Sequence, residues 1–549
     1  MSFIKNGAFA VIALLFLTST GLAEQTIVPT NIQNINCDKI KSFEKTLDGS
    51  PIWNGWGNGY EQARFQPASV GKLSANNLGN LKLAWAYGFS NSNKVDAQPT
   101  IIGARIFSSG GSNTIHAIDL ATGCKVWSTS LSGRVRTTIV ASKIDNKLYL
   151  FLGDQNGTAY AIDADTGKKI WSKRLDNHPY AQITGSPVVF NSVVYFPTSS
   201  GWEEGASANP SYQCCTFRGS LSALNAADGS VIWKTYTIQE PAAKNSAGRM
   251  GPSGAGIWSS PTIDPAEGKI YVATGNNFSL PATTTSDAVI ALSLIDGSIL
   301  WTKQITPKDA TNNSCYESNR NNCPIPGAPD HDFAASVILV TTDQNRKILV
   351  AGQKSGVVTA LDASKSGEIL WQKKIGSGSP LGGIQYGMAS DGKKVYAAIS
   401  FIQSVKSTSS TTGAQQGVDG WYVLGSRGGG LHALDIMSGE IKWSTPHPGC
   451  KQVPGCSQAQ SAAVTATDGF VLSGGLDGVL RAYSSDDGKI IWETDTKISV
   501  KGNNGVTARG GSMDGPGPVI APGMILVSSG YQMFGGIPGN ALFAFSLPD

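Results

Sequence analysis

One pattern recurs seven times along the chain: a short apolar strand, a turn closed by Gly, and a second strand that ends in Trp. Apolar and polar residues that alternate around a Gly turn are typical of a β-hairpin. A hairpin repeated at long intervals constrains the architecture before any single residue is interpreted. The copies are IHAIDLATGCKVW (115–127), AYAIDADTGKKIW (159–171), LSALNAADGSVIW (221–233), VIALSLIDGSILW (289–301), VTALDASKSGEILW (358–371), LHALDIMSGEIKW (431–443) and LRAYSSDDGKIIW (480–492).

The intervals between copies predict four-stranded sheets arranged in a ring. Each interval has room for four short strands with their loops, and few segments show a helical period. The Trp stands at one fixed place in every copy, where its ring would pack one sheet against the next. A solenoid could use the same unit, but a closed ring, the β-propeller, better explains the lack of helices.

The two ends of the chain complement each other. Residues 77–89 (NLGNLKLAWAYGF) carry a Trp without the strand that usually precedes it, and 540–549 (NALFAFSLPD) are the first half of a unit without its Trp. The first strand is therefore predicted to complete the last blade. Seven whole units and one split unit predict an all-β, eight-bladed propeller of four-stranded antiparallel blades over 77–549, with an N-terminal extension at 24–76.

Residues 1–23 are typical of a secretory signal peptide: Lys5 precedes the apolar run AFAVIALLFL, and small residues end the segment. The run is too short to span a bilayer. After cleavage near Ala23, the protein is expected in the periplasm or outside the cell, with no membrane span. The net charge of +4 is too small to indicate binding to nucleic acid.

The eight cysteines are an even number, which suits disulfide pairing in an oxidising compartment. Adjacent Cys214 and Cys215 either bridge each other or each take a different partner. No Cys-x-x-Cys-His segment occurs, which excludes covalent haem c, and the five His lack zinc-ligand spacing. The remaining pairs are predicted from short bracketed loops and, for the last, by elimination: Cys315 with Cys323, Cys450 with Cys456, and Cys37 with Cys124.

Four consecutive intervals are long and hold most of the unusual chemistry: 172–220, 234–288, 302–357 and 372–430. Insertions in a propeller rise from one face, so these are expected to gather at one end of the central channel. They favour an enzyme over the plain alternative, a binding scaffold.

Several segments, taken in order, resemble the alcohol dehydrogenases that depend on pyrroloquinoline quinone (PQQ), and within that family the polyvinyl alcohol branch. The resemblance runs over about residues 53–549. It implies an eight-bladed enzyme that oxidises an alcohol with PQQ and Ca²⁺. The segments are ARFQP (63–67), YQCCTFRGSLSALNAADG (212–229), IWSSPTID (257–264), YVATGNNFSLP (271–281), APDHDFAAS (328–336), AGQKSGVVTALD (351–362), LGGIQYG (381–387) and SGYQMFGGIPGNALFAFS (529–546).

The resemblance implies a set of cofactor-binding residues. Trp258, outside the repeat position, matches the aromatic floor under the quinone, and the pair Cys214 and Cys215 would form the opposite wall. The plain alternatives are a packed core Trp and, for the polar residues, ordinary loop positions. The other expected cofactor contacts are Asp96 in DAQP, Arg136 in VRTT, Thr184 in ITGSP, Arg218 after the cysteine pair, Lys354 in QKSG and Gln385 in GGIQY.

The resemblance also implies a calcium site, and Ca²⁺ prefers hard oxygen ligands. Asn276 in TGNN matches the amide ligand of the family. Glu203 in SSGWEE is the first choice for the carboxylate ligand of the calcium site, and Glu204 is the alternative. Without a metal, both residues would simply belong to a solvated acidic turn.

Oxidation of an alcohol needs a carboxylate that takes the hydroxyl proton while hydride leaves to the quinone. Asp332 matches the catalytic base of the family and is also expected to bind the metal. Asp330 is the second choice for the base. The alternative without a catalytic role is that the Asp residue only forms a turn. Lys354 is implied to polarise the quinone oxygens.

The electron acceptor is expected to be a separate soluble cytochrome c, by resemblance and because the chain has no haem motif. Two other interpretations stay open. The substrate could be another alcohol, an aldehyde or a sugar, because loop shape decides specificity. The chain could also be a non-enzymatic periplasmic scaffold, although such proteins typically have short loops between blades.

Overall fold

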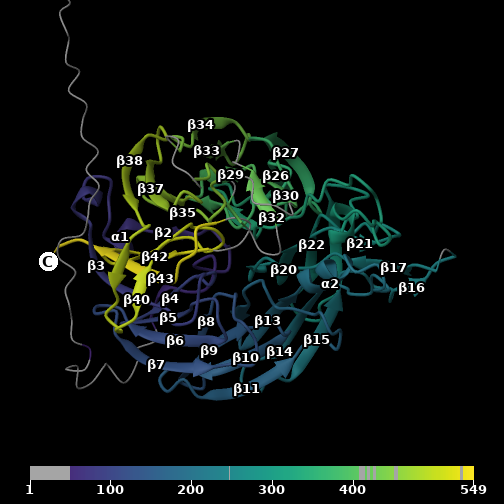
Figure 1. Ribbon diagram of the computed structural model, residues 1–549, viewed down its shortest axis with the longest axis horizontal. Coiled ribbons are helices and arrows are strands. Elements are labelled where there is room, and N and C mark those ends of the chain that lie inside the picture. Colours follow the sequence, from purple (N-terminus) through teal and green to yellow (C-terminus); the bar gives the residue numbers. More distant parts are fainter. Residues whose placement is uncertain are drawn as a thin grey trace, which may run out of the picture.

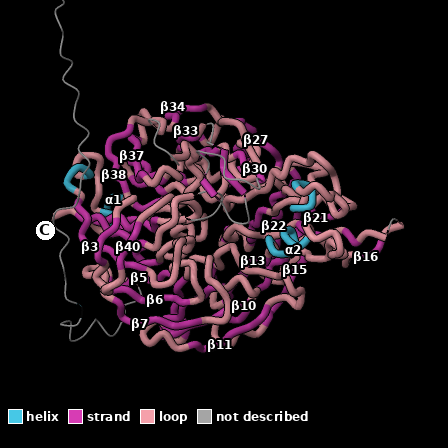
Figure 2. Tube along the Cα trace, in the orientation of Figure 1, coloured by secondary structure: helices cyan, strands magenta, loops and turns pink. Residues whose placement is uncertain are grey.

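The computed structural model describes residue 37 and residues 50–548, apart from 247, 407–414, 417–420, 425–427, 451–455 and 532–535. The predicted signal peptide at 1–23 lies outside the described residues. Within them, eight four-stranded antiparallel blades surround a central axis, as the repeat predicts (Figure 1). In Figure 2 strands dominate the ring and the few short helices lie at its edges.

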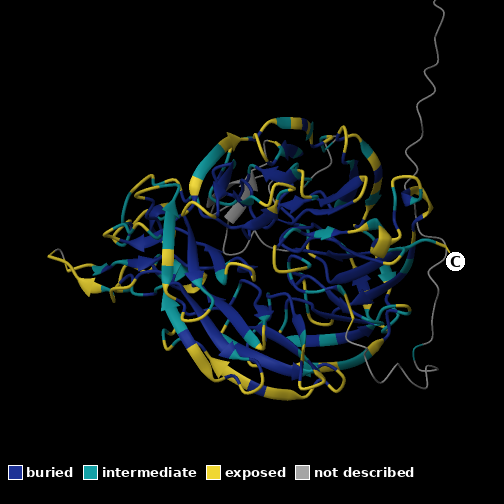
Figure 3. Cartoon of the chain, turned by 180° about the vertical axis from the view of Figure 1, so that it is seen from behind, coloured by how far each residue is buried: buried dark blue, intermediate teal, exposed yellow. Residues whose placement is uncertain are grey.

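Each blade runs from a short inner strand to an outer strand, which is partly exposed in every blade except the last, where β3 is mostly buried. The first four blades contain β4 (Thr100–Ile102), β5 (Arg105–Ser109), β6 (Thr114–Asp119) and β7 (Lys125–Ser130); β8 (Val140–Ile144), β9 (Lys147–Gly153), β10 (Thr158–Asp163) and β11 (Lys169–Arg174); β12 (Val188–Phe190), β13 (Val193–Thr198), β14 (Ser220–Asn225) and β15 (Val231–Tyr236); and β19 (Thr262–Asp264), β20 (Lys269–Ala273), β22 (Ala288–Ser293) and β23 (Ile299–Gln304). The last four contain β24 (Ile338–Thr341), β25 (Lys347–Gly352), β26 (Val357–Asp362) and β27 (Glu368–Lys374); β28 (Ala389–Ser390), β29 (Lys394–Ser400), β33 (Gly429–Asp435) and β34 (Ile441–Pro446); β35 (Thr465–Thr467), β36 (Phe470–Gly474), β37 (Val479–Ser484) and β38 (Ile490–Asp495); and β41 (Val519–Ala521), β42 (Met524–Ser529), β43 (Ala541–Ser546) and β3 (Lys82–Gly88). In Figure 3 the inner strands are buried, and exposed residues lie mainly on the outer strands and loops.

The split blade closes the ring as predicted. Strand β3, from the start of the ring, pairs antiparallel with β43 at its end, and Trp85 lies opposite Ala544. Trp85 then takes the same place in this blade that the repeat Trp takes in the others, and its indole nitrogen donates to Leu120 O of the first blade at 3.0 Å.

The repeat Trp and Gly form the contact between neighbouring blades. The indole nitrogen of Trp127 donates to Ala164 O in the next blade at 3.0 Å. Its ring lies against Gly167, where an added Cβ would come within 2.7 Å of the indole, and the φ of +71° at this turn also favours Gly. Trp301 and Trp492 are exceptions, because among the described residues neither indole nitrogen has an acceptor; the ring of Trp492 packs edge-on against Phe545.

The extension before β3 fills one part of the central channel and contacts inner strands around the ring. β1 (Pro51–Trp53) pairs antiparallel with β4, and β2 (Phe65–Gln66) pairs parallel with β35. Between them, backbone carbonyls of the extension accept from inner-strand nitrogens of three further blades: Tyr60 O from Ile263, Glu61 O from Leu339, and Ala63 O from Ser390. Residues 51–67 therefore tie the blades together along the axis.

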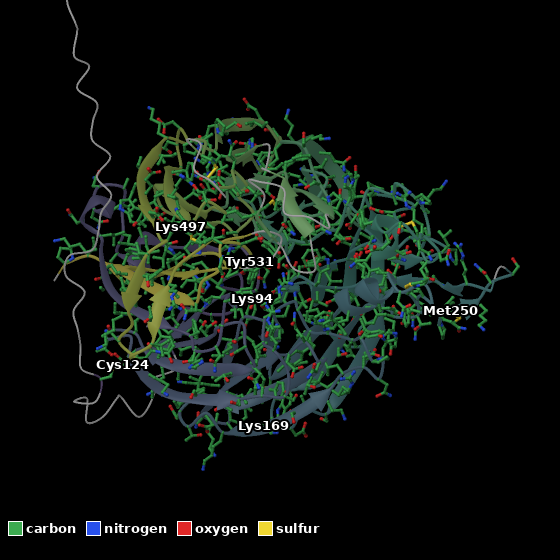
Figure 4. The ribbon with its side chains drawn as sticks, in the orientation of Figure 1. Lys94, Cys124, Lys169, Met250, Lys497 and Tyr531 are labelled. Atoms are coloured by element: carbon green, nitrogen blue, oxygen red, sulfur yellow. A yellow bond between two sulfur atoms is a disulfide. The ribbon has the colours of Figure 1, made fainter. Side chains whose placement is uncertain are left out.

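The remaining elements are short and lie outside the blades. The hairpin β16 with β17 projects from the ring, with Met250 near its tip (Figures 1 and 4). These elements are α1 (Ala68–Gly71), η2 (Leu78–Asn80), α2 (Gly201–Ala206), β16 (Ala243–Lys244), β17 (Met250–Gly251), β18 (Ser253–Gly254), β21 (Asn277–Ser279), η3 (Asn313–Tyr316), β30 (Gln403–Lys406), β31 (Gln415–Gln416), β32 (Trp421–Leu424), β39 (Ser499–Lys501) and β40 (Thr507–Arg509).

All eight cysteines form disulfides, and every predicted pair is present: Cys37–Cys124, Cys315–Cys323, Cys450–Cys456 and, for the open case, Cys214 with its neighbour Cys215. None of the helices in the described part of the chain is both long and apolar enough to cross a bilayer.

Candidate active site

Antiparallel strands bring two kinds of loop to the same face of the ring: those between the second and third strands of a blade, and those that lead from one blade to the next. Asn276 and Lys354 stand on loops of the first kind, and Trp258 and Asp332 on loops of the second. The topology thus gathers residues far apart in the sequence at one end of the channel.

Lys354 joins two of the predicted acids. Its ammonium nitrogen donates to Asp332 Oδ2 at 2.7 Å and to Asp330 Oδ1 at 3.1 Å, and all three side chains are buried. A backbone hydrogen bond from Lys354 N to Asp332 O fixes the two loops against each other. Burial opposes the charge of the lysine, but the two carboxylates outweigh it and raise its pKa.

Asn276 contacts the same carboxylate from the other side. Its backbone nitrogen donates to Asp332 Oδ1 at 2.8 Å, and its side-chain nitrogen donates to Thr311 O at 2.8 Å. This second bond fixes the amide plane. The amide oxygen accepts no hydrogen bond from the described residues, so it is available to a ligand.

The two adjacent glutamates of α2 have different environments. Ser200 caps the helix, and Glu203 is fully buried. Glu203 Oε1 accepts from Tyr212 Oη and Thr216 N, both at 2.7 Å, and Oε2 accepts from Phe217 N at 2.8 Å. Its carboxylate is therefore occupied in anchoring the segment that follows the cysteine pair.

Glu204 interacts instead with the acids around Lys354. Burial and the nearby charge of Asp330 raise the pKa of Glu204 to about 8, while Lys354 opposes the shift. A carboxyl group with its charge suppressed by like charges is the state expected of a cation ligand before the cation binds.

The structure adds two acids that the sequence analysis did not identify. Asp287 is fully buried, and both of its carboxylate oxygens lack a hydrogen-bond partner in the described chain. Burial and the charge of Asp332 raise the pKa of Asp287 well above its ordinary value. Asp309 is also buried, and Oδ2 accepts from His331 N at 2.7 Å.

A signal for Asp287 was present in the repeat. The residue just before the third strand of a blade is Gly in five of the other six repeats, and here it is Asp with a left-handed φ of +48°. A side chain at a position that favours Gly indicates a specific role.

Together these side chains form the acid cluster, which surrounds Lys354: Glu204, Asp287, Asp309, Asp330 and Asp332. No three His, Cys, Asp or Glu side chains in the described part converge closely enough to hold a metal by themselves. A cation here would need the Asn276 amide oxygen and further oxygens from a bound molecule.

An aromatic ring borders the acid cluster. The Trp258 ring centroid lies 5.5 Å from the Lys354 ammonium nitrogen, and the ring of Tyr386 meets it edge-on at 6.5 Å. Cys214 and Cys215 are buried with Phe217 and Phe278. An isolated bridge between Arg218 and Gly254 leads from the cysteine pair toward the strand that precedes Trp258.

Arg136, Thr184 and Gln385 lie on loops of the same face. The Arg136 guanidinium lies 5.6 Å from the Tyr386 ring centroid, and the Tyr386 hydroxyl is 3.2 Å from that of Tyr531. The Thr184 hydroxyl bonds to Ser199. Gln385 is buried, and its side-chain oxygen has no partner in the described chain, as expected for a group that awaits a ligand.

Two residues that were predicted to contact the cofactor interact with other residues of the protein. Asp96 forms an ion pair with Arg134. Arg218 donates to Ile238 O at 3.1 Å and to Gln239 O at 2.7 Å, and its guanidinium stacks on Tyr236 at 4.0 Å. The contact of Asp96 and Arg218 with a cofactor stays a prediction from the resemblance.

The arrangement offers three chemical capabilities side by side. A carboxylate fixed by Asn276 and Lys354 can accept a proton, an excess of negative charge can attract a cation, and an indole face can support a flat ring.

Comparison with known proteins gives two kinds of match. A family model described as outer membrane protein assembly factor BamB matches residues 49–288, 218–414 and 354–537. A polyvinylalcohol dehydrogenase of Pseudomonas sp is 38% identical over 521 residues, which are 90% of this chain and 77% of that protein. Another, of Sphingopyxis sp. (strain 113P3), is 37% identical over 91% of this chain and 77% of its own length.

Among solved structures, a quinohemoprotein alcohol dehydrogenase from Comamonas testosteroni superposes with a TM-score of 0.65 at 19% identity, over 92% of this chain and 83% of that one. A europium-containing methanol dehydrogenase gives 0.63 at 16% identity, over 91% and 98%. At such low identity these two structures show the shared fold alone.

Proposed function

Because this chain belongs to the family of PQQ-dependent alcohol dehydrogenases, we propose that it oxidises a secondary alcohol, such as the carbinol of polyvinyl alcohol, with PQQ and Ca²⁺. The observation that carries the proposal is the bridge from Lys354 to Asp330 and Asp332 beside the indole of Trp258. It unites a fixed carboxylate, a cation and a flat apolar surface in one buried place.

The residues present fit the cofactor and the ion. Trp258 offers a face for a planar ring and Arg136 a charge for carboxylates, and Gln385 offers a buried amide oxygen that has no partner among the described residues. Bound PQQ supplies the electrophilic carbon that accepts hydride, and bound Ca²⁺ increases that electrophilicity.

Asp332 is the proposed base. Its two oxygens accept hydrogen bonds from Asn276 N and from Lys354, which fixes the orientation of the carboxylate. In the reaction Asp332 takes the hydroxyl proton, the C–H bond of the carbinol breaks with transfer of hydride, and a ketone remains. Asp330 stays the second candidate, because burial and Asp332 raise its pKa to about 7 even with Lys354 nearby.

For calcium we propose Glu204, Asn276 and Asp332 as ligands. Glu204 takes the place of Glu203, because Glu204 interacts with Asp330 and Lys354, whereas the carboxylate of Glu203 holds the backbone of Thr216 and Phe217. Three oxygens from the protein leave further positions for oxygens of the quinone and of the substrate.

We further propose that a soluble cytochrome c accepts the electrons and that the enzyme works in the periplasm or outside the cell. Four disulfides in the described chain support an oxidising compartment.

Reconstitution tests the proposal directly. Purified apo-protein should bind PQQ in the presence of Ca²⁺, change the absorbance spectrum of the quinone, and reduce an artificial dye with butan-2-ol or polyvinyl alcohol. Chelation of Ca²⁺ should abolish dye reduction, and Asp332→Asn should retain PQQ while losing turnover. Failure to bind PQQ would contradict the proposal and favour a non-enzymatic scaffold, whereas activity only with sugars or aldehydes would correct the substrate.

A further inference from the structure

A cavity of about 650 Å³ lies on the same face of the ring as the acid cluster. One wall is the loop 89–93, which leads from β3 to the inner strand of the first blade. The opposite wall is the hairpin β39–β40, and Asn540 stands between them. All three segments connect either the second and third strands of a blade or one blade with the next, and loops of these two kinds also carry the active-site residues.

One buried amide fixes the shape of this cavity. The Asn540 side chain donates to Phe89 O at 2.9 Å and to Thr507 O at 3.1 Å, and it accepts from Arg509 N at 2.8 Å. Gly539 N also donates to Asn93 O at 3.1 Å. The two walls are therefore tied together by hydrogen bonds.

The lining is polar and carries no carboxylate. Ser90, Asn91, Thr507 and Arg509 are exposed, and Phe89 lies buried beneath them. Hydroxyl, amide and guanidinium groups donate and accept hydrogen bonds with neutral hydroxyls. The volume exceeds what a single ion or a short alcohol would fill, so the lining suits an extended ligand with many hydroxyl groups.

The cavity adjoins the active site through a short series of contacts. Its loop 89–93 continues into Lys94, which forms a β-bridge with Tyr531, and both lie toward the middle of the ring (Figure 4). Tyr531 contacts Tyr386, whose ring meets Trp258. Tyr531 and Tyr386 are buried, so these contacts connect the wall of the cavity to the indole, and a bound chain would pass over them.

We propose that the cavity is a remote subsite that holds one stretch of a neutral, hydroxyl-bearing polymer while a carbinol further along the same chain reaches Asp332. This inference rests on the proposed function and adds the substrate class to it. Two relatives are named as polyvinylalcohol dehydrogenases, and a polymer substrate extends well beyond the reacting carbon. Binding energy from such remote contacts lowers the KM of a long substrate and leaves that of a short one unchanged.

The test compares a polymer with a single-carbinol alcohol. The triple variant Asn91→Ala, Thr507→Val, Arg509→Gln changes exposed side chains only. Its KM for polyvinyl alcohol should rise by about tenfold, the size expected for a few lost hydrogen bonds, while kcat and the KM for butan-2-ol stay at wild-type values. Arg249→Gln, on the projecting hairpin, is the matched control and should change neither KM.

Equal shifts in both KM values, or none, would overturn the subsite. A loss confined to turnover with cytochrome c would overturn it too, because the cavity would then contact the electron acceptor. Titration calorimetry of the apo-protein with polyvinyl alcohol provides a readout without turnover: the triple variant should bind the polymer about tenfold more weakly than wild type. If the wild type oxidised no alcohol, the proposed function would fail, but this titration would still decide whether the cavity binds the polymer.

Discussion

Lys354→Met removes one charge from the centre of the acid cluster while keeping the length of the side chain. The ammonium nitrogen lies within 3.1 Å of carboxylate oxygens of both Asp330 and Asp332. The variant leaves these two buried acids next to each other without their common counter-ion. We expect it to be folded but nearly inactive at neutral pH.

The size of the expected loss of activity follows from the burial of the ion pair. Removing one partner of a buried pair costs about 3–5 kcal/mol, because the remaining charge stays desolvated. The pair of acids avoids this cost by binding a proton. The pKa of Asp330, raised by burial to about 7 with Lys354 present, should then rise further, because Lys354 is the main influence that lowers it. Loss of a charged base lowers kcat by about 10²–10⁴-fold.

The assay is the pH profile of kcat with butan-2-ol on the PQQ- and Ca²⁺-loaded protein. The acid limb of the profile should move to higher pH in Lys354→Met, so that alkaline buffer restores part of the activity. Lys497→Met, at a partly exposed lysine that pairs with Asp495, is the control and should retain the wild-type profile. Wild-type kcat at pH 7 in Lys354→Met, with an unmoved acid limb, would refute the assigned role of this charge.

Four further substitutions test the calcium ligand, a buried ion pair and the contact between blades. Glu204→Gln should weaken Ca²⁺ binding in a titration by about tenfold or more without lowering the thermal midpoint of the apo-protein, whereas Glu203→Gln should destabilise it by about 2–4 kcal/mol. Burial opposes the charge of Asp477, but a buried His and a buried Arg hold the pKa of its carboxyl group at about 2. The charged form of Asp477 therefore adds about 2 kcal/mol to the stability of the fold above pH 4. This contribution is lost as pH falls from about 4 to 2, so Asp477→Asn should be less stable at pH 7 and approach wild type near pH 2 in denaturant titrations. Gly167→Ala places a Cβ within 2.7 Å of the Trp127 indole at a positive φ and should cost about 1–3 kcal/mol by calorimetry, whereas an unchanged midpoint would contradict the docking role.

The fold could be predicted because the sequence pattern that specifies each blade is local and is repeated along the chain. Hairpin, Gly turn and Trp recur in the sequence, and the half units at 77–89 and 540–549 predicted the closing pair β3 and β43. The extension at 51–67 could not be placed, because it has no repeat of its own. Its position depends on contacts with inner strands from the whole length of the chain.

The site was predictable as a set of residues but not in its assignments. Asp330, Asp332 and Lys354 come together as expected, since resemblance preserves the order of loops. Which of Glu203 and Glu204 turns toward the acids depends on where α2 begins, and neighbouring residues in a helix point in different directions.

The pairing of β3 with β43 has a consequence for how the protein is made. The ribosome makes β3 before the seven other blades and its partner strand after them. The ring therefore cannot close until those blades have been made, and the search for a contact between such distant segments is slow. Until then the Trp and the apolar strand of the unpaired edge remain available to holding chaperones.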